Sequence, residues 1–388
     1  MKIAMFSHTC YPFTNGVSTS VEQLASSLRN RNHEVTLVSN NYDEFCNDFS
    51  SSENIKVVSI PIFYQKLRTP ILFNPRLMKI LADHNFDIAH SHSDFGLAML
   101  ARQYSIINNK PLIQTYHCDY LNYAKSNFGE KSKTFFKQPV KYYTKMICGT
   151  ADRVIVPSLE TKRLLNEDFH IKRDLDYIPN GVDISKFEIE TPRVTYLKKQ
   201  LGIKDGDFVL LSVSRLSKEK GLDAIISLLP LLKDCNKLKL LLVGGGPDEK
   251  KLKTLTNLLN LDNVIFTGEI PFEDIQNYYH LGSAFISNSH AETQGLTVIE
   301  ALASSLPAFC PNIPIFQELV ENNINGFLFN NYEELVNIIR GCYYNQQSLK
   351  NYKQNAKEKA NQFSLSQSVQ KIENVYEEEC YKKTLTRK

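Results

Sequence analysis

The sequence lacks the features of a membrane-spanning or exported protein. No run approaches the roughly eighteen uncharged apolar residues that span a bilayer, and the apolar start at residues 2–6 gives way at once to Ser7, His8 and Thr9. We therefore expect neither a transmembrane helix nor a signal peptide. The eight cysteines show no paired short spacing, which favours reduced structural thiols and a cytoplasmic location.

Strong net charge, short repeats and low-complexity tracts are also lacking. The formal net charge of +3 is too small to indicate a nucleic-acid partner. The charge is unevenly divided, because residues 1–174 carry 21 Lys and Arg against 16 Asp and Glu, whereas residues 175–388 carry 24 against 26. The basic excess therefore belongs to the first half of the chain.

The chain length of 388 residues exceeds what one hydrophobic core usually supports, so we expect two domains. A strand, a helical pattern with Val21, Leu24, Ala25 and Leu28 on one face, and a second strand follow one another at the start. This βαβ order demands a parallel sheet. The strands predicted in the first half are residues 2–6, 35–38, 55–60, 88–90, 112–114 and 154–156.

The same pattern restarts after residues 184–204, where Pro192 and charged residues interrupt the apolar periodicity. We expect an α/β protein with two doubly wound, Rossmann-like domains whose ligand-binding loops face a central cleft. The strands predicted in the second half are residues 208–213, 238–243, 264–266, 284–286 and 308–309. The predicted divisions are an acceptor-binding domain at 1–183, a linker at 184–206, a nucleotide-sugar-binding domain at 207–364, and a helix at 365–388 that packs back toward the first domain.

Two basic residues follow the first predicted strand of the second domain. Arg215 and Lys220 lie at the carboxyl edge of strand 208–213, where the chain enters a helix. An arginine fork and a mobile lysine suit a diphosphate and offset the charge of a departing nucleotide. The alternative is a solvated, basic helix start.

A glycine-rich turn follows the next strand of this domain. Gly244, Gly245 and Gly246 precede Pro247, and they permit close approach of a ligand to the backbone at a helix start. The dinucleotide fingerprint Gly-x-Gly-x-x-Gly lacks its third glycine here, which disfavours a nicotinamide dehydrogenase. A tight connecting turn is the alternative.

The segment 292–301 is the most specific one in the chain. It places two carboxylates, Glu292 and Glu300, on either side of a glycine loop that runs into a helix. Backbone amides at the helix start would point at phosphate or sugar oxygens, Glu300 could accept two ribose hydroxyls, and Glu292 could bind hydroxyls of a hexose. Coincidental acids at a helix start are the alternative. The donor-binding residues predicted here are Glu292, Thr293, Gln294, Gly295, Leu296 and Glu300.

Small and titratable residues lie at the corresponding edge of the first domain. Gly16 lies past the first strand, where a small residue lets the backbone approach phosphate, and His117 follows strand 112–114. His90 and His92 end another strand, and each of these histidines could instead be structural. An Asp-x-Asp at residues 174–176 has metal-binding spacing but lies on no obvious cleft loop, so we predict no metal site.

A basic and aromatic segment lies between residues 125 and 145. The segment contains several lysines and only one acidic residue, Glu130, and aromatic residues lie between the lysines in the sequence. Lysines near an anionic leaflet contribute about 1 kcal/mol each, and aromatic side chains enter the headgroup region. The segment predicts a membrane-binding or acceptor-binding surface, with an ordinary solvated helix face as the alternative. The residues predicted to form this surface are Lys133, Phe135, Phe136, Lys137, Lys141 and Lys145.

Several of these motifs together resemble the retaining family 4 glycosyltransferases, over nearly the whole chain. They are ADRVIVPS at 151–158, IPNGVD at 178–183, Arg215 with Lys220, and ETQGLTVIE at 292–300. Within that family, NGVSTS at 15–20, TYHCDY at 115–120 and ETQGLT at 292–297 resemble the bacterial diacylglycerol glycosyltransferases, which are monoglycosyldiacylglycerol synthases.

The resemblance implies a GT-B fold and a retaining transfer of glucose or galactose from a UDP-sugar to 1,2-diacylglycerol at the inner face of the cell membrane. It implies peripheral binding to an anionic membrane surface, and no metal, cofactor or side-chain nucleophile. By this resemblance the diphosphate is held by Arg215 and Lys220, the ribose by Glu300 and the hexose by Glu292, with His117 beside the reacting sugar and Gly16 and Gly245 at the donor.

Two other functions fit the same residues. One is a glycosyltransferase of cell-surface polysaccharide or of another glycoconjugate, which would keep the donor site and change the acceptor. The other is a non-catalytic protein that binds nucleotide sugars, against which the intact set of charged residues argues. A test with nucleotide sugars, with and without lipid vesicles, separates these functions.

Overall fold

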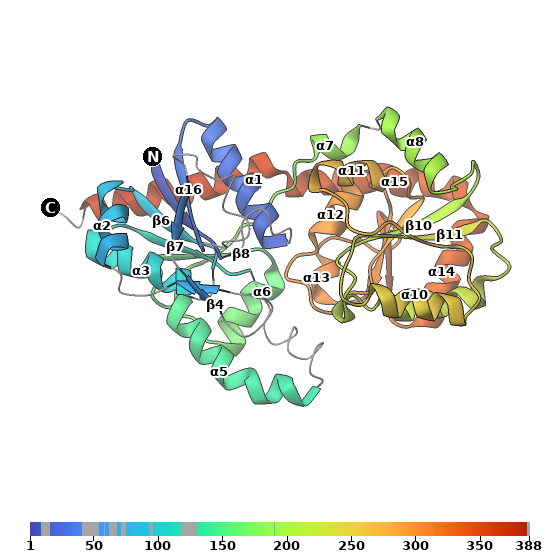
Figure 1. The fold of residues 1–388 in the computed structure, drawn as a ribbon, viewed down its shortest axis with the longest axis horizontal. Helices are drawn as coiled ribbons and strands as arrows, with labels where there is room; N and C mark the ends of the chain where they lie inside the picture. The colour runs from blue at the N-terminus through green and yellow to red at the C-terminus, as the bar shows by residue number, and fades with distance from the viewer. Residues whose placement is uncertain are drawn as a thin grey trace. The chain divides into compact units, whose positions relative to one another are not determined.

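The computed structural model describes residues 1–8, 16–40, 54–57, 59–61, 68–70, 75–93, 96–117, 130–189 and 191–385, with backbone alone between 54 and 70, at 76 and at 130–134. The chain forms two compact units (Figure 1). Unit 1 comprises Met1–Cys118, Phe136–Gly181 and Leu365–Lys388, and unit 2 comprises Asp119–Phe135 and Val182–Ser364. Each unit has its own parallel sheet and its own apolar core.

Unit 1 is built around a seven-stranded parallel sheet with the strand order β3-β2-β1-β6-β7-β8-β9. Its central strands are buried, which is why they appear in the sequence as continuous apolar runs. The strands of the sheet are β1 (Lys2–Phe6), β2 (Glu34–Asn40), β3 (Asn54–Val57), β6 (Ile88–Ser91), β7 (Leu112–Thr115), β8 (Arg153–Val156) and β9 (Leu175–Tyr177).

Two details of this sheet differ from the prediction. The single strand expected at 55–60 is wrong, because β3 joins the main sheet beside β2, whereas β4 (Ser59–Pro61) pairs in antiparallel with β5 (Arg68–Pro70). The edge strand β9 was not expected. Its three residues are Leu-Asp-Tyr, and the central aspartate interrupts the apolar run that would have indicated a buried strand.

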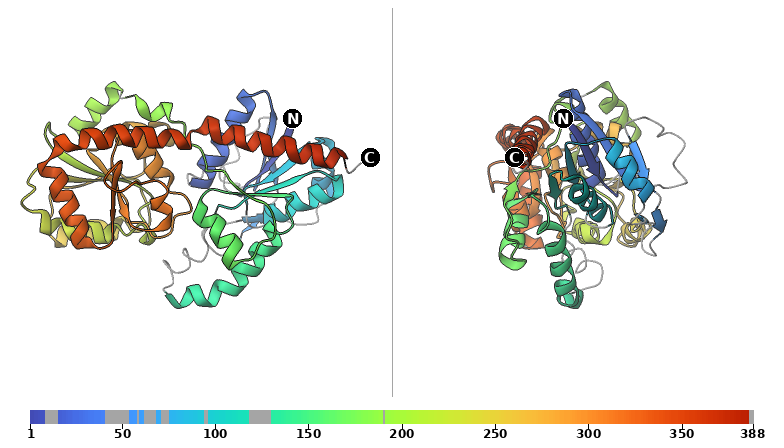
Figure 2. Two further views of the ribbon diagram at one scale, coloured as in Figure 1. Left: turned by 180° about the vertical axis from the view of Figure 1, so that it is seen from behind. Right: turned by 90° about the vertical axis from the view of Figure 1, so that its left-hand side faces the viewer.

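Helices cover the two faces of this sheet. One face carries α1 and α16, since Val21, Leu24 and Leu28 of α1 share a core with Ile372 and Val375 of α16. Figure 2 shows α16, in red, running along the sheet of unit 1. The helices are α1 (Gly16–Asn30), α2 (Pro75–Asp83), α3 (Gly96–Asn108), α5 (Glu130–Cys148), α6 (Leu159–Arg163), the π-helix η2 (Leu164–Asp168) and α16 (Leu365–Leu385).

Ion pairs fasten α16 within unit 1. Glu373 accepts hydrogen bonds from Arg31, at 2.5 Å, and from His33, at 2.9 Å. Further along the helix, Glu379 lies 3.4 Å from Arg153 of β8. The two carboxylates are buried, so the guanidinium groups of Arg31 and Arg153 compensate the desolvation of the charge.

Unit 2 is built around a six-stranded parallel sheet with the strand order β12-β11-β10-β13-β14-β15. The strands expected in the second half are all present, and β15 is additional. This edge strand begins at Gly326, which faces the β14 backbone so closely that an added Cβ would lie 2.1 Å from the carbonyl oxygen of Ala308. The strands are β10 (Phe208–Val213), β11 (Leu238–Val243), β12 (Val264–Phe266), β13 (Ala284–Ile286), β14 (Ala308–Pro311) and β15 (Gly326–Phe329).

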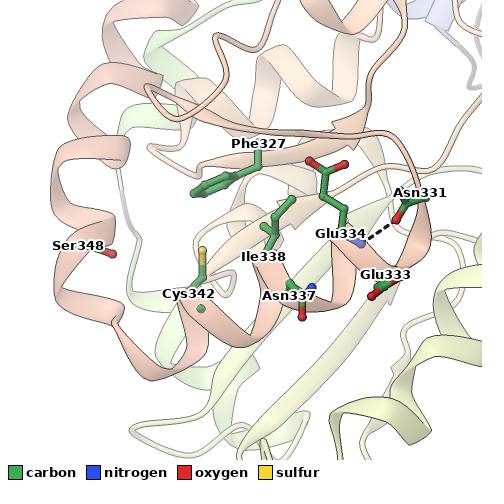
Figure 3. A pocket seen from close by; sticks show the side chains of 9 residues that line it. Phe327, Asn331, Glu333, Glu334, Asn337, Ile338, Cys342 and Ser348 are labelled. Carbon is green, nitrogen blue, oxygen red and sulfur yellow. Dashed lines mark hydrogen bonds between the residues drawn. The ribbon is translucent and has the colours of Figure 1, made fainter.

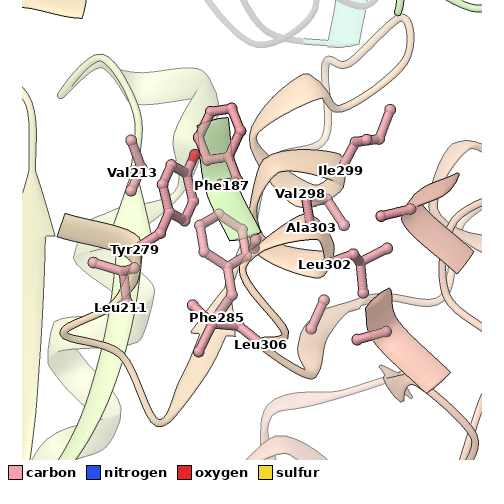
Figure 4. Packing of buried hydrophobic residues seen from close by; sticks show 14 of the residues in the cluster. Phe187, Leu211, Val213, Tyr279, Phe285, Val298, Ile299, Leu302, Ala303 and Leu306 are labelled. Carbon is pink, nitrogen blue, oxygen red and sulfur yellow. The ribbon is translucent and has the colours of Figure 1, made fainter. Parts of the chain in front are cut away.

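Two apolar clusters, one on each face, hold this sheet between helices. Figure 4 shows part of one, where Phe187, Tyr279 and Phe285 pack beside Val298 and Leu302. The helices are α7 (Ser185–Glu188), α8 (Pro192–Gln200), η3 (Lys218–Lys220), α9 (Leu222–Leu228), η4 (Leu229–Leu232), α10 (Glu249–Leu258), η5 (Phe272–Asp274), α11 (Ile275–Tyr279), α12 (Leu296–Ala303), α13 (Pro314–Gln317), α14 (Tyr332–Tyr344), η6 (Gln346–Ser348), α15 (Leu349–Ala360) and η7 (Asn361–Phe363).

The segment 184–206, expected as a linker, is part of the unit 2 core. Phe187 of α7 and Val194 and Leu197 of α8 are buried in the same cluster as Tyr279. Pro192 interrupts the sequence pattern because it begins α8, where a residue without a backbone N–H is tolerated. The proline therefore marks a helix start inside the unit.

Candidate active site

The sheet of unit 2 has its topological switch point between β10 and β13. The chain leaves β10 toward β11 on one side and returns to β13 on the other, so the loops after β10 and β13 diverge at the carboxyl edge. Such a divergence is where open α/β sheets bind ligands. Residues 214–221 form the first loop and 287–295 the second, and the predicted donor residues of unit 2 lie on these loops or just beyond them, apart from Gly245.

An ion pair joins the two loops. Nζ of Lys220, at the end of η3, lies 2.5 Å from Oε1 of Glu292. The side chains are 21% and 19% exposed, so the pair is partly desolvated while its outer face stays accessible. The structure thus brings together a cation and a carboxylate that lie far apart in the sequence.

A second contact between the loops was missed from the sequence. Gly221 has φ of +59°, and its carbonyl oxygen accepts a hydrogen bond of 2.9 Å from Nδ2 of Asn288. The same Nδ2 lies 3.2 Å from the Tyr332 hydroxyl of α14. An added Cβ at Gly221 would lie 2.5 Å from Nδ2, so glycine is required on two grounds. A lone asparagine after a strand gave no signal of this role.

The other predicted cation of the first loop, Arg215, is exposed. No side-chain hydrogen bond or ion pair of Arg215 is present among the residues that the structure describes. The guanidinium therefore lies at the carboxyl edge of β10 with its five donors available to a ligand.

The glycine turn after β11 is shaped by the neighbouring loop. Gly244 has φ of +128°, and an added Cβ would lie 2.2 Å from the carbonyl oxygen of Ser214. At Gly246 the corresponding distance to the carbonyl oxygen of Leu216 is 2.4 Å. The carbonyl oxygen of Gly245 accepts a hydrogen bond from the Leu216 backbone. Close packing against the first loop therefore explains by itself why Gly244 and Gly246 are glycines.

The second loop ends at the start of α12. Gly295 precedes the helix with φ of +81°, and its carbonyl oxygen accepts the first helical hydrogen bond, from Val298. Gln294 is buried, and Thr293 and Leu296 are half-buried beside this start. The first amides of a helix have no intrahelical acceptor, so this end of α12 offers donors to an anion.

Glu300 lies one turn into α12 and is 8% exposed. Burial raises the pKa of its carboxyl to about 7, and a hydrogen bond from the Tyr279 hydroxyl, at 2.5 Å, opposes that rise. Burial and the adjacent carboxylate raise the pKa of Tyr279 well above its ordinary value, so the phenol stays a donor. Tyr279, from α11, thus contacts a predicted donor residue, and the sequence did not indicate this contact.

Histidines gather at the carboxyl edge of the unit 1 sheet, where the switch point lies between β1 and β6. Nδ1 of His92 lies 3.0 Å from Nε2 of His117, and Nδ1 of His8 lies 2.9 Å from Oγ of Ser93. His90 contacts the Tyr376 hydroxyl of α16 and Oγ1 of Thr115, which is a structural use of that histidine.

Burial holds these imidazoles neutral. It lowers the pKa of His117 and of His90 to about 3 and that of His8 to about 4, and the pKa of His92 falls well below its ordinary value. The histidines therefore act as hydrogen-bonding groups rather than as cations. Gly16, the first residue of α1, is exposed at the same edge of unit 1, past β1.

The segment predicted to bind a membrane or acceptor forms α5. Phe135 is 76% exposed, and Phe136, Lys137 and Lys145 are exposed too. Lys141 differs, since its Nζ donates to the backbone carbonyl of Asp168 at 2.5 Å. The side chain of Lys133 lies outside the described residues. Among the helices that the structure describes, none has both the length and the apolar character of a membrane span.

No metal site is present among the described side chains. Within that part of the chain, no group of three or more His, Cys, Asp or Glu residues is arranged to hold an ion. Asp176 of the Asp-x-Asp sequence is instead engaged by Arg153, at 2.6 and 2.8 Å.

A hollow of about 560 Å³ lies elsewhere in unit 2, against α14. Figure 3 shows residues that line it, among them the apolar side chains of Phe327, Ile338 and Cys342 and the acidic side chains of Glu333 and Glu334. None of the predicted donor residues lines it. The hollow is therefore separate from the converging charges of the switch point.

Comparison with known proteins assigns both halves of the chain to glycosyltransferase families. The model of Glycosyltransferase Family 4 matches residues 14–186, and that of Glycosyl transferases group 1 matches residues 194–359. An alpha-monoglucosyldiacylglycerol synthase of Streptococcus pneumoniae is 33% identical over 349 residues, which is 87% of this chain and 77% of the relative. The enzyme of the same name from Acholeplasma laidlawii is 28% identical over 390 residues, which is 97% of this chain and 96% of the relative.

Solved structures give the same fold. Anabaena HepE, crystallised in complex with UDP and glucose, superimposes with a TM-score of 0.76 at 22% identity, covering 97% of this chain and all of that one. At this identity the likeness supports the fold alone. The predicted fold class of two Rossmann-like α/β domains is confirmed.

Proposed function

Because the chain belongs to the family 4 glycosyltransferases and has their GT-B fold, we propose that this hexosyltransferase moves glucose or galactose from a UDP-sugar to 1,2-diacylglycerol at a membrane surface. The observation that carries the donor half is the Lys220–Glu292 pair across the switch point of unit 2, with Glu300 buried one turn into α12. The acceptor half is supported by the 33% identity to an alpha-monoglucosyldiacylglycerol synthase.

In this proposal, charged side chains of unit 2 bind the diphosphate, the hexose and the ribose of the donor. Arg215 and Lys220 hold the diphosphate, and the amides from Gly295 to the start of α12 contact its oxygens. Glu292 accepts hydrogen bonds from hexose hydroxyls while it keeps Lys220 in place. Glu300 accepts the ribose hydroxyls, for which its ionised form is required. Gly245, Thr293 and Gln294 complete the proposed donor contacts. HepE, which has the same fold, has also been crystallised in complex with UDP-glucose.

The proposed chemistry leaves the anomeric configuration unchanged. The bond between C1 of the hexose and the oxygen of the β-phosphate breaks, and a bond from C1 to the free hydroxyl oxygen of diacylglycerol forms on the same face. The hydroxyl proton passes to the departing phosphate, whose charge Arg215 and Lys220 offset. His117 lines the reacting sugar and Gly16 contacts phosphate in this proposal, and no side-chain nucleophile takes part.

The acceptor surface is proposed to be α5. Its exposed aromatic side chains Phe135 and Phe136 would enter the headgroup region, and Lys133, Lys137 and Lys145 would attract an anionic leaflet at the cytoplasmic face of the cell membrane. Lys141 contributes its charge from a fixed position, because its Nζ is bound to the Asp168 carbonyl.

A direct assay tests the proposal. The purified protein is incubated with UDP-glucose or UDP-galactose and with anionic vesicles that contain or lack 1,2-diacylglycerol, and products are identified by mass and linkage. We expect an α-linked monohexosyl diacylglycerol only in vesicles that contain the acceptor. Transfer to a polyprenyl phosphate or a soluble glycan instead would assign the enzyme to other glycoconjugates. Binding of UDP without any transfer would contradict the enzymatic proposal.

A further inference from the structure

The contact between His92 and His117 bears on how His117 meets a sugar. Nδ1 of His92 lies 3.0 Å from Nε2 of His117, with ring centroids 5.3 Å apart. The two residues are 3% and 6% exposed, and burial keeps both rings neutral at pH 7. A neutral imidazole has one N–H and one bare nitrogen, so a hydrogen bond between two of them fixes the tautomers of both.

The second ring nitrogen of His92 decides the direction of this bond. Nε2 of His92 is buried and has no hydrogen-bond partner among the described residues. If His117 were the donor, Nε2 of His92 would carry an N–H into a place without an acceptor. Orphaned buried N–H groups are rarer than orphaned acceptors, and a bare nitrogen needs no room for a hydrogen.

We propose that His92 is a positioning residue whose Nδ1–H donates to Nε2 of His117 and thereby holds His117 as the Nδ1–H tautomer. His117 then presents an N–H, and not a basic nitrogen, away from His92. That group is a donor for a hydroxyl oxygen of the hexose or for a phosphate oxygen. The inference rests on the proposed function in taking His117 to face the reacting sugar, and it excludes His117 as the base that deprotonates the acceptor.

A second ring keeps His92 in place. The ring centroids of His90 and His92 are 3.9 Å apart. Both nitrogens of His90 are engaged, Nδ1 with the Tyr376 hydroxyl at 2.5 Å and Nε2 with Oγ1 of Thr115 at 2.7 Å. His90 cannot turn without losing both bonds, so His92 contacts a fixed ring on one side and His117 on the other. Through Tyr376, the helix α16 supports this arrangement.

Nitrogen NMR of the full chain, labelled with [15N]histidine, reads the tautomer directly. Long-range proton–nitrogen spectra distinguish Nδ1–H from Nε2–H, and the His117→Gln variant assigns the His117 signals among the nine histidines. We expect the wild-type His117 to be the Nδ1–H form at pH 7. An Nε2–H form in the wild type would overturn the proposal, whether or not the protein transfers sugar.

Two substitutions at His92 test the consequence for turnover. In His92→Leu the bond is lost, so we expect a mixture of His117 tautomers and a kcat that falls by about tenfold to a hundredfold, with a smaller change in the donor KM. In His92→Asn the side-chain amide nitrogen takes the place of Nδ1, and we expect the Nδ1–H form to return with most of the lost turnover. His84→Leu, which removes an exposed histidine of the same unit, is the matched control.

The outcomes separate this inference from the proposed function. An unchanged kcat in His92→Leu contradicts the role of His92. A folded His92→Asn variant in which His117 does not return to the Nδ1–H form contradicts it too. If His92→Leu does not fold, the wild-type spectrum and His92→Asn still decide. A wild-type protein with the Nδ1–H form but no hexose transfer contradicts the proposed function and leaves the tautomer assignment in place.

Discussion

The carboxyl edges of the two sheets carry opposite chemistry on the same architecture. In unit 2 the edge holds charged groups, and the Lys220–Glu292 pair keeps about a fifth of each side chain exposed. In unit 1 the edge holds His92 and His117, which are almost fully buried and neutral. The same fold thus presents an accessible charged pair at one switch point and, where burial disfavours the charged form of the imidazoles, neutral hydrogen-bonding groups at the other.

The largest expected difference between the units is their response to acid. The folded-state pKa values of His8, His90 and His117 lie at about 3 to 4, below the ordinary value of 6.5. The unfolded chain therefore binds more protons as the pH falls below 6.5, and the free energy of unfolding of unit 1 falls with it. At pH 5 the loss is about 2 kcal/mol for each such histidine.

Hydrogen exchange of the whole protein, read separately for the two sheets at pH 7 and pH 5, measures this difference. Protection of β1, β6 and β7 should fall much more than protection of β10 and β13. The His84→Gln variant, which removes an exposed histidine, should behave as the wild type. Equal loss in both sheets would remove the distinction between the two edges.

Glu300 should give unit 2 the opposite pH dependence. Its folded pKa, about 7, is above the ordinary value of 4.5, so the folded state keeps a proton that the unfolded state loses between these pH values. Its contribution is present below pH 4.5 and is lost as the pH rises to 7. Glu300→Gln should therefore stabilise unit 2 by about 3 kcal/mol at pH 8 and by much less at pH 5.

Denaturation monitored in unit 2 at the two pH values tests this, with Glu333→Gln, an exposed acid of α14, as the control. Donor use should fall in Glu300→Gln even though the protein is more stable. In Tyr279→Phe the carboxyl loses the hydrogen bond that opposes the rise of its pKa, so the pH profile of turnover should move to higher pH. An unmoved profile would mean that Glu300 ionisation does not govern donor use.

Substitution of Lys220 tests whether the charged side chains at the carboxyl edge of the unit 2 sheet bind the donor. Lys220→Ala removes the proposed diphosphate contact and leaves Glu292 without its cation, so we expect kcat/KM to fall by about thirtyfold, or about 2 kcal/mol. Lys218→Ala, two residues away on the exposed side of η3, is the matched control and should change it little. A Lys220→Ala variant with normal kcat/KM would place the donor elsewhere.

The smallest expected effect concerns α5. Replacing Lys137 and Lys145 by glutamine should weaken binding to anionic vesicles by about 1 kcal/mol for each lysine, most visibly at low salt, and should leave UDP affinity unchanged. Lys233→Gln with Lys350→Gln removes two exposed charges of unit 2 and is the control. Cosedimentation at graded salt gives the answer, and equal binding by both double variants would remove α5 from the membrane contact.

The fold was predictable where burial leaves a mark on the sequence. β10 and β11 are six-residue apolar runs because helices cover both faces of the sheet, and such runs are visible without a structure. β9 has an aspartate at its centre and β15 begins with a glycine, so neither is the uninterrupted apolar run by which the similarly short β12 could be recognised. Residues 184–206 read as a linker because the burial of Phe187 and Val194 depends on a partner surface, which local periodicity does not encode.

Candidate site residues could be predicted where polar side chains follow the end of a strand. Arg215, Glu292 and His117 could be singled out because the carboxyl ends of parallel strands gather at one edge. Tyr279 and Asn288 could not, because each acts through a contact with a residue distant in sequence, Glu300 and Gly221 respectively. Tyrosine on an apolar helix face and asparagine in a loop are too common to indicate such contacts.

The pairing of Lys220 with Glu292 has a consequence for selectivity among anions. A lysine that already has a carboxylate partner gains little from a lone phosphate ion, because the newcomer meets the repulsion of Glu292 as well as the attraction of Nζ. In the proposed donor site, the hydroxyl groups of a sugar nucleotide would hydrogen-bond to Glu292 at the same time, and would so turn the repelling group into a contact. The pair would thereby favour the complete donor over the abundant phosphates of a cell.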